Sequence, residues 1–271
     1  MKIDSFYGYL VVAAIFVKFV TDPFCANASE LSSASARGET LTVRRLLEEG
    51  ADPDETDEEG YTPLMRAVFA GSSRPLSMHF DVVNLLAGAG ANVNASVDTL
   101  PPEDENPIRT VSSLHRTVSD GAAFLELTFL LLEKGADPNL TGAWGRPLHV
   151  AAASEKAGAH EVKLLLDWGA DAKALNQWRL EPLVEAVTAV NPSIEKIALL
   201  LEAGSDVNAL FDWAEHRGLS VLMAAAINAT SDIVELLLEH GAHKYSQCND
   251  GLTAYDYAVR AERLDNASAL Q

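Results

Sequence analysis

The sequence predicts an all-α solenoid of stacked helix-turn-helix units with projecting β-hairpin or finger loops. Three observations predict it: a leucine-rich phrase ending in glycine recurs six times, a helix-starting phrase precedes most of its copies, and aromatic residues are sparse. The chain has 271 residues, of which 48% are hydrophobic and 7% aromatic. This composition supports a sizeable core of closely packed helices and argues against wholesale disorder.

The recurring phrase is a pair of leucines followed closely by a glycine and a polar turn residue. A helix with paired leucines on one face ends at the glycine, which adopts the left-handed C-cap conformation at little cost. The regular spacing of about 33 residues plus insertions is the signature of a repeat architecture. The glycines that end the six copies stand at positions 50, 90, 135, 169, 204 and 241.

A second phrase precedes most copies and predicts the start of another helix. It is clearest at 60–64, 145–149 and 179–183, and weaker at 112–115, 220–223 and 251–254. Threonine or serine caps the free amides of a new helix, and proline fits its first turn. Alanine runs at 151–153 and 224–226 then allow close helix packing.

This order of turn, short helix, leucine-rich helix and glycine resembles the ankyrin-repeat family over residues 29–271. The resemblance implies about six repeats, stacked side by side with finger loops at right angles, and a polar C-terminal cap at 255–270. The first helix of the opening unit, 31–38, matches the family poorly.

Residues 1–28 are predicted to be a signal peptide cleaved after Ala28. Lys2 precedes an apolar run at 9–17, and Ala26 and Ala28 supply the small residues of a cleavage site. An amphipathic N-terminal extension is the alternative. Cleavage implies a periplasmic or secreted protein with no membrane span. It also leaves Cys248 as the single cysteine, so no intramolecular disulfide is expected.

Three insertions depart from the family pattern: 72–80, 96–110 and 212–217. Long loops in a compact array are either functional or tolerated, and both interpretations stay open for the acidic, proline-rich segment 101–107.

Aromatic residues gather on the predicted fingers. Trp144 and Trp178 align at the same finger position, whereas Trp168 ends a leucine-rich helix and is expected to pack. Exposed aromatics dominate interface energies, although packing between fingers is the alternative. The aromatic candidates for contacting a partner are Tyr61, Trp144, Trp178, Phe211 and Trp213.

Acidic residues accompany these aromatics. The formal charge is −19, which argues against nucleic acid and favours a basic protein partner, with plain solvation as the alternative. Carboxylates cluster in one finger, and Glu55, Glu58 and Glu59 are candidate contacts there; Asp212 and Glu215 lie in a later finger. Charge would steer the encounter and aromatics would hold the complex.

No motif for catalysis, metal binding or a cofactor is present: the sequence lacks a phosphate loop, zinc-spaced Cys/His pairs, HExxH and GxSxG. His115 and His149 match the helix-opening position of the family, where the role is structural. Cys248 is expected to be a quiet small residue, unless it is exposed and reactive.

We therefore expect a non-enzymatic, monomeric binding protein that holds a basic protein partner through the concave finger surface. Its acidity, export and irregular insertions favour an immunity or inhibitor protein. A protective accessory of a periplasmic enzyme and a host-directed secreted effector are the alternatives, because fold does not determine function.

Overall fold

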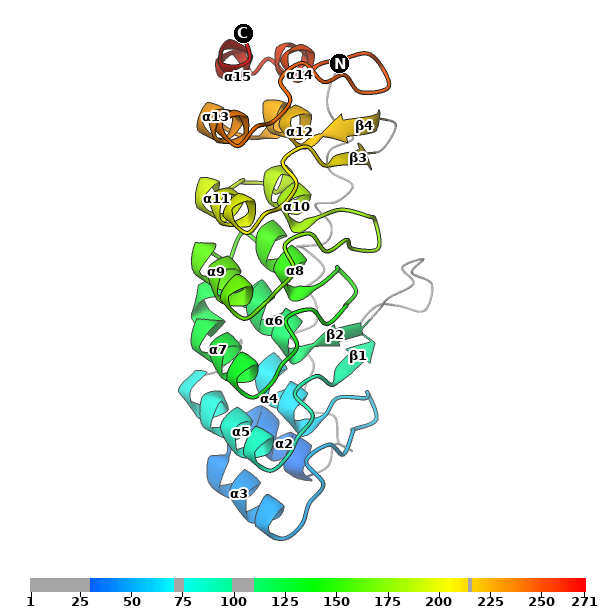
Figure 1. The fold of residues 1–271 in the computed structure, drawn as a ribbon. Coiled ribbons are helices and arrows are strands. Elements are labelled where there is room, and N and C mark those ends of the chain that lie inside the picture. Colours follow the sequence, from blue (N-terminus) through cyan, green and yellow to red (C-terminus); the bar gives the residue numbers. More distant parts are fainter. Residues whose placement is uncertain (1–29, 71–75, 99–109, 214–215) are drawn as a thin grey trace. The chain divides into compact units, whose positions relative to one another are not determined.

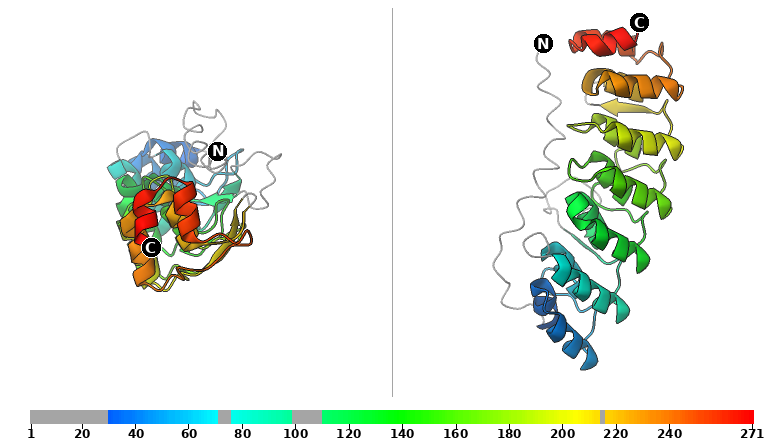
Figure 2. Two further views of the ribbon diagram at one scale, coloured as in Figure 1. Left: turned by 90° about the horizontal axis from the view of Figure 1, so that it is seen from above. Right: turned by 90° about the vertical axis from the view of Figure 1, so that its left-hand side faces the viewer.

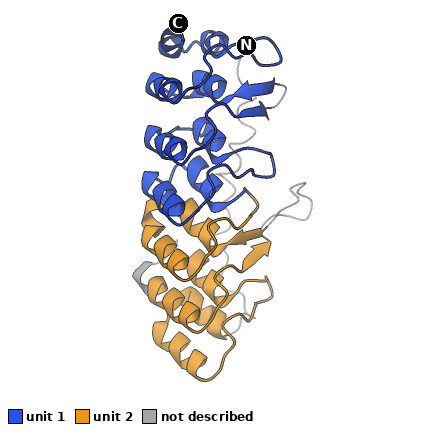
Figure 3. Ribbon diagram, viewed as in Figure 1, with its two compact units in different colours: residues 1–8, 144–271 blue, residues 9–143 orange. Residues whose placement is uncertain are grey.

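The structure is a computed structural model that describes residues 30–70, 76–98, 110–213 and 216–271 (Figure 1). The predicted signal peptide, Cys25, Glu215 and most of the 96–110 insertion lie outside these residues. The described residues form two compact units: the N-terminal unit ends at Ala143, and the C-terminal unit begins at Trp144 (Figure 3).

The N-terminal unit stacks three helix pairs. In each pair we call the first helix inner and the second outer; inner helices contact inner helices of neighbouring repeats, and outer contact outer. The elements are α2 (Glu30–Arg37), α3 (Thr40–Glu48), α4 (Pro63–Ala70), α5 (Leu76–Gly88), β1 (Ser96–Asp98), β2 (Thr110–Ser112), α6 (Ser113–Asp120), the 3-10 turn η3 (Gly121–Phe124) and α7 (Leu125–Glu133). The poorly matched opening helix is therefore formed, as α2.

The C-terminal unit stacks four helix pairs in successive layers (Figure 2). Its elements are α8 (Pro147–Ala153), α9 (Ala159–Asp167), α10 (Pro182–Thr188), α11 (Ile194–Glu202), β3 (Leu210–Trp213), β4 (His216–Ser220), α12 (Val221–Asn228), α13 (Ser231–Glu239), α14 (Ala254–Arg260) and α15 (Leu264–Ala269). The last pair is the predicted C-terminal cap. None of the helices in the described segments is long and apolar enough to cross a bilayer.

The predicted helix ends are confirmed. At the first, Ala51 N donates to Leu46 O across Gly50, whose φ is 90°. This left-handed turn closes the outer helix and satisfies its last carbonyls. The other five repeat-ending glycines also have φ between 85° and 95°. At least one leucine of each pair is buried, namely Leu46, Leu86, Leu131, Leu165, Leu200 and Leu237. In two pairs the second leucine, Leu132 or Leu201, is buried as well.

The predicted helix starts are confirmed as well. Pro63, Pro147 and Pro182 are the first residues of α4, α8 and α10. Where proline is absent, a hydroxyl caps the helix: Ser220 Oγ accepts from Met223 N at 3.2 Å, and Thr253 Oγ1 accepts from Asp256 N at 3.3 Å. These caps satisfy amides that have no partner inside the helix.

Four inner helices, α2, α8, α10 and α12, end close to a polar side chain from the following repeat. Lys196 Nζ donates to Ala151 O and Ser154 O at the end of α8, at 2.9 and 2.6 Å. Asn228 Nδ2 donates to Val187 O and Ala189 O at the end of α10. In the N-terminal unit, His79 Nε2 lies 3.4 Å from Ala36 O of α2. Burial lowers the pKa of Lys196 to about 8.

Asn266 makes the fullest of these caps. Its Nδ2 lies 3.4, 3.0 and 3.0 Å from the oxygens of Ala225, Ala226 and Ala229, and its side chain is buried. Arg263 also donates to Ala229 O. The last repeat therefore closes the end of α12.

Neighbouring fingers are joined by hydrogen bonds. A side-chain oxygen in the turn of one finger accepts a hydrogen bond from a backbone amide of the next finger. Asn208 Oδ1 accepts from His243 N at 2.8 Å, and Asn94 Oδ1 accepts from Asp137 N at 2.7 Å. Lys173 occupies this position in another finger and cannot accept a hydrogen bond. There Glu181 Oε2 accepts from Asp206 N instead, at 3.2 Å.

Asn266→Ala should lower the free energy of unfolding by about 1–3 kcal/mol, because it leaves buried carbonyls without donors. Urea unfolding followed by circular dichroism measures the change. Asn191→Ala is the control, since Asn191 is exposed and its side chain bonds only Glu155 within the described residues; its effect should stay within about 0.5 kcal/mol. Equal effects of the two substitutions would contradict the capping role.

Candidate functional site

The first finger, residues 52–62, is built around the side chain of Asp57. Its Oδ1 accepts hydrogen bonds from Glu59 N and Tyr61 N, each at 3.0 Å, and Gly60 N donates to Asp57 O at 2.9 Å. Only 2% of the Asp57 side chain is exposed. A short polar side chain thus holds the whole turn from inside.

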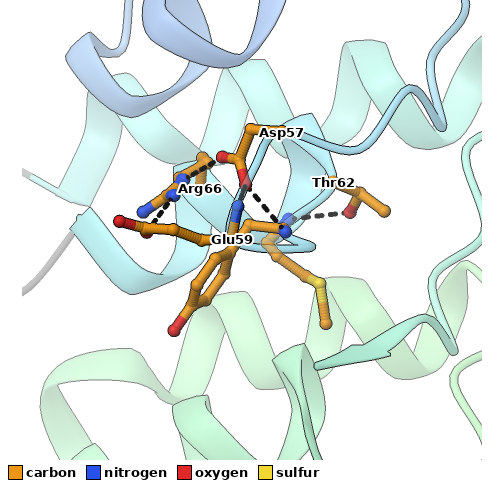
Figure 4. A network of polar contacts seen from close by, with 6 residues as sticks. Asp57, Glu59, Thr62 and Arg66 are labelled. Atoms are coloured by element: carbon orange, nitrogen blue, oxygen red, sulfur yellow. Dashed lines mark hydrogen bonds and ion pairs between the residues drawn. The ribbon is translucent and has the colours of Figure 1, made fainter. Parts of the chain in front are cut away.

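Arg66 of α4 ties this turn to the inner helix (Figure 4). Its Nε donates to Asp57 Oδ2 at 2.6 Å, and a second guanidinium nitrogen pairs with Glu59. The guanidinium also lies 4.1 Å from the centre of the Tyr61 ring, within cation–π range. Burial opposes the charge of Arg66, but the hydrogen bonds to Asp57 and Glu59 outweigh it and raise its pKa.

Tyr61 is therefore held in place rather than freely presented. Its ring meets Phe69 edge-on, with centroids 5.4 Å apart and planes at 75°. Arg116 of α6 lies 5.7 Å from the Phe69 ring and pairs with Asp120 at 2.9 Å. Burial raises the pKa of the Tyr61 hydroxyl, with Arg66 acting in the opposite direction.

The three predicted acidic contacts do not share one environment. Glu59 is committed to Arg66. Glu55 and Glu58 are exposed, and neither takes part in an ion pair within the described segments. Of these three candidate contacts, Glu55 and Glu58 are thus open to a partner, whereas Glu59 is held by Arg66.

The same turn recurs at finger 171–181 with different chemistry. Asn176 Oδ1 accepts from Trp178 N at 2.9 Å and Leu180 N at 3.0 Å, and Arg179 N donates to Asn176 O at 2.9 Å. Asn176 Nδ2 reaches the inner helix α10 by donating to Glu185 Oε1 at 2.8 Å. Burial raises the pKa of Glu185 to about 7, and the Asn176 bond opposes the shift.

A third copy joins Cys248 to Tyr257, whose Sγ and hydroxyl are 3.4 Å apart. In all three copies the finger residue precedes its helix partner by nine positions: Asp57 and Arg66, Asn176 and Glu185, Cys248 and Tyr257. The sequence reasoning missed these pairs because their chemistry differs while the spacing persists. Cys248 is buried, as expected of a quiet packing residue.

The tryptophans of the C-terminal unit share one finger register. Trp144, Trp178 and Trp213 each stand nine residues after a repeat-ending glycine, namely Gly135, Gly169 and Gly204. Trp178 is 37% exposed, and Trp144 and Trp213 are intermediate. Three successive fingers thus present indole groups at the same position.

Two aromatic predictions need correction. Phe211 is only 6% exposed, because it lies on the inward side of the β3–β4 hairpin and meets Trp213 edge-on at 6.1 Å. It positions Trp213 and is not available to a partner. Trp168, expected to pack, is 40% exposed at the C-cap of α9.

Metal chemistry finds no support in the described part of the chain, where no three His, Cys, Asp or Glu side chains are grouped to hold an ion. His149 has a structural role instead. Its Nε2 lies 3.0 Å from both Ala174 O and Leu180 O at the base of finger 171–181, and burial lowers its pKa to about 4. The neutral ring therefore anchors the finger that carries Trp178.

Known proteins share this repeat pattern. Residues 189–271 match the family model for ankyrin repeats (3 copies), and residues 31–78 match that for ankyrin repeats (many copies). Cyclin-dependent kinase 4 inhibitor B of Rattus norvegicus is 32% identical over 133 residues, covering 49% of this chain and 85% of that protein. Human cyclin-dependent kinase inhibitor 2A is 31% identical over 137 residues, covering 50% and 74%.

A solved structure agrees with the fold. The human ASB11 ankyrin repeat domain superposes with a TM-score of 0.63 at 22% identity, covering 89% of this chain and 96% of that one. Helix pairs, finger loops and these similarities define a protein–protein interaction module. The chain belongs to the ankyrin-repeat family.

Arg66→Met should lower the free energy of unfolding by about 2–3 kcal/mol, because it leaves the nearly buried Asp57 carboxylate without its counter-ion. Chemical denaturation measures this change. Arg45→Met is the matched control, since Arg45 pairs with Glu30 and Glu49 at exposed positions; it should remain close to wild type. A loss at Arg66 no larger than that at Arg45 would show that the network does not hold the finger.

Proposed function

We propose that this protein is an exported binding module that occupies the surface of a protein partner and inhibits it, as an immunity or inhibitor protein does. The observation that carries the proposal is the shared register of Trp144, Trp178 and Trp213 on consecutive fingers. Tryptophan is enriched among the few residues that dominate interface energies. A rigid turn beneath such a side chain also reduces the entropy lost on binding.

Inhibition is supported by the relatives, whose names describe inhibitors of cyclin-dependent kinases. An ankyrin-repeat chain can thus act on an enzyme by binding it. For this chain we propose a different setting, periplasmic or secreted, because residues 1–28 have the order of basic, apolar and small residues of a signal peptide.

The partner is proposed to be basic where it meets finger 52–62. Glu55 and Glu58 are exposed there, and the chain carries a formal charge of −19. Such charge raises the association rate at low ionic strength more than it strengthens the final complex. The protein is proposed to act as a monomer.

Trp178→Ala should weaken partner binding at least tenfold, or about 1.4–2 kcal/mol, because it removes an exposed aromatic anchor. The mature chain, residues 29–271, serves as bait for the envelope and secreted proteins of the source organism. The captured partner is identified by mass spectrometry, and its dissociation constant is then measured.

Trp168→Ala is the matched control, since Trp168 is as exposed as Trp178 but ends a helix instead of a finger turn. Loss of binding with Trp168→Ala but not Trp178→Ala would refute the finger site. The partner's own activity decides the role: stoichiometric loss of that activity supports inhibition, whereas protection of an enzyme would make the chain an accessory.

Neutralising Glu55 and Glu58 together, as Glu55→Gln and Glu58→Gln, should slow association and reduce its dependence on salt, since steering acts before contact. Stopped-flow association at several salt concentrations measures both. The control removes two exposed charges from outer helices, as Glu126→Gln and Glu235→Gln, and should change the rate less. Identical rates for the two pairs would remove the case for a basic partner at this finger.

A further inference from the structure

One finger turn contains a residue that the fold does not require. Gly60, Arg179 and Gly251 occupy the same position, and each amide donates to the carbonyl of the residue three positions earlier, at 2.9 Å. All three have positive φ, of 84°, 61° and 74° respectively. Arginine therefore stands where the two matching turns use glycine.

This placement is unfavourable for the backbone. A side chain in the left-handed region brings Cβ close to the following carbonyl, whereas glycine has no Cβ to strain. No polar contact of the Arg179 side chain offsets this strain, because its guanidinium forms no ion pair or side-chain hydrogen bond with the residues the structure describes. Residues held in such conformations cluster at sites of function.

The finger that carries Arg179 also exposes apolar side chains. Trp178, in the same turn, is 37% exposed, and Leu175 on the same finger is 49% exposed. Leu210, on the following finger, is 67% exposed. Arg179 thus directly follows an exposed indole in an ordered turn.

The carboxylates that the structure describes on these fingers accept hydrogen bonds within the protein. Asp171 Oδ1 accepts from Lys173 N, and Asp206 Oδ1 accepts from Asn208 N, each at 2.9 Å. Asp212 accepts from Gly218 N and Arg217, which lowers its pKa. Glu181 accepts from Asp206 N. Despite the overall negative charge, no acceptor among the described residues binds the guanidinium of Arg179.

We propose that Arg179 determines specificity by binding an aspartate or glutamate side chain of the partner, beside an apolar residue that packs on Trp178 and Leu175. The inference rests on the proposed function, since it assumes that this finger contacts a protein. Guanidinium matches carboxylate through paired N–H donors, which gives direction as well as attraction. The partner is thus basic opposite Glu55 and Glu58, and acidic opposite Arg179.

A random peptide library displayed on phage tests the proposal with the purified protein as the target. Selected peptides should carry an Asp or Glu next to an apolar residue. They should bind Arg179→Gly at least tenfold more weakly than wild type, while the melting temperature of this variant stays equal or rises. Arg179→Lys should bind with intermediate affinity, because it keeps the charge but loses the paired donors.

A double-mutant cycle separates direct contact from indirect effects. Replacing the acidic residue of the peptide by its amide should weaken binding to wild type, but should have little further effect on Arg179→Gly. Equal binding to wild type and Arg179→Gly, or selection of peptides without an acidic residue, would overturn the inference. Peptides that depend on Trp178 but not on Arg179 would leave the proposed function standing. Peptides that depend on neither would remove the finger from both proposals.

Discussion

The last carbonyls of an α-helix have no partner within the helix, and the stacking of this chain depends on how they are satisfied. At α8, α10 and α12 the donors come from the following repeat: Lys196, Asn228 and Asn266. The donors differ in charge and length, but the task is the same. Each of these three repeats therefore depends on its successor to complete its hydrogen bonds, which is a physical basis of cooperativity in such arrays.

The finger turns are held in place by side chains of the inner helices. Arg66 and Glu185 project from inner helices and hold the turns at Asp57 and Asn176, and His149 supports the second turn from a neighbouring repeat. Because the turns are fixed from below, the tip residues are presented without a large ordering cost on binding.

The sequence was sufficient to predict the helix pairs, the repeat-ending glycines and the finger loops, because each of these follows from local chemistry repeated in register. Exposure of individual side chains was not predictable in this way. Phe211 and Trp213 are close in sequence, but the hairpin turns the first inward. Glu59 differs from Glu58 only because Arg66 reaches it from α4. The exposure of such side chains depends on which face of the finger turn packs against the inner helix.

The fingers with turns at Asp57, Asn176 and Cys248 show that the backbone of the turn and the residue exposed at its tip vary independently. Their turn bond is the same, 2.9 Å in each, although the residue beneath is Asp57, Asn176 or Cys248. The tip two positions later is Glu59, Trp178 or Asp250. Because the backbone bond carries the turn, a change of tip alters what the finger presents without altering how it folds. Net charge is consequently a poor guide to any one contact: an acidic chain can offer an arginine beside an indole wherever its own carboxylates are bound to backbone amides.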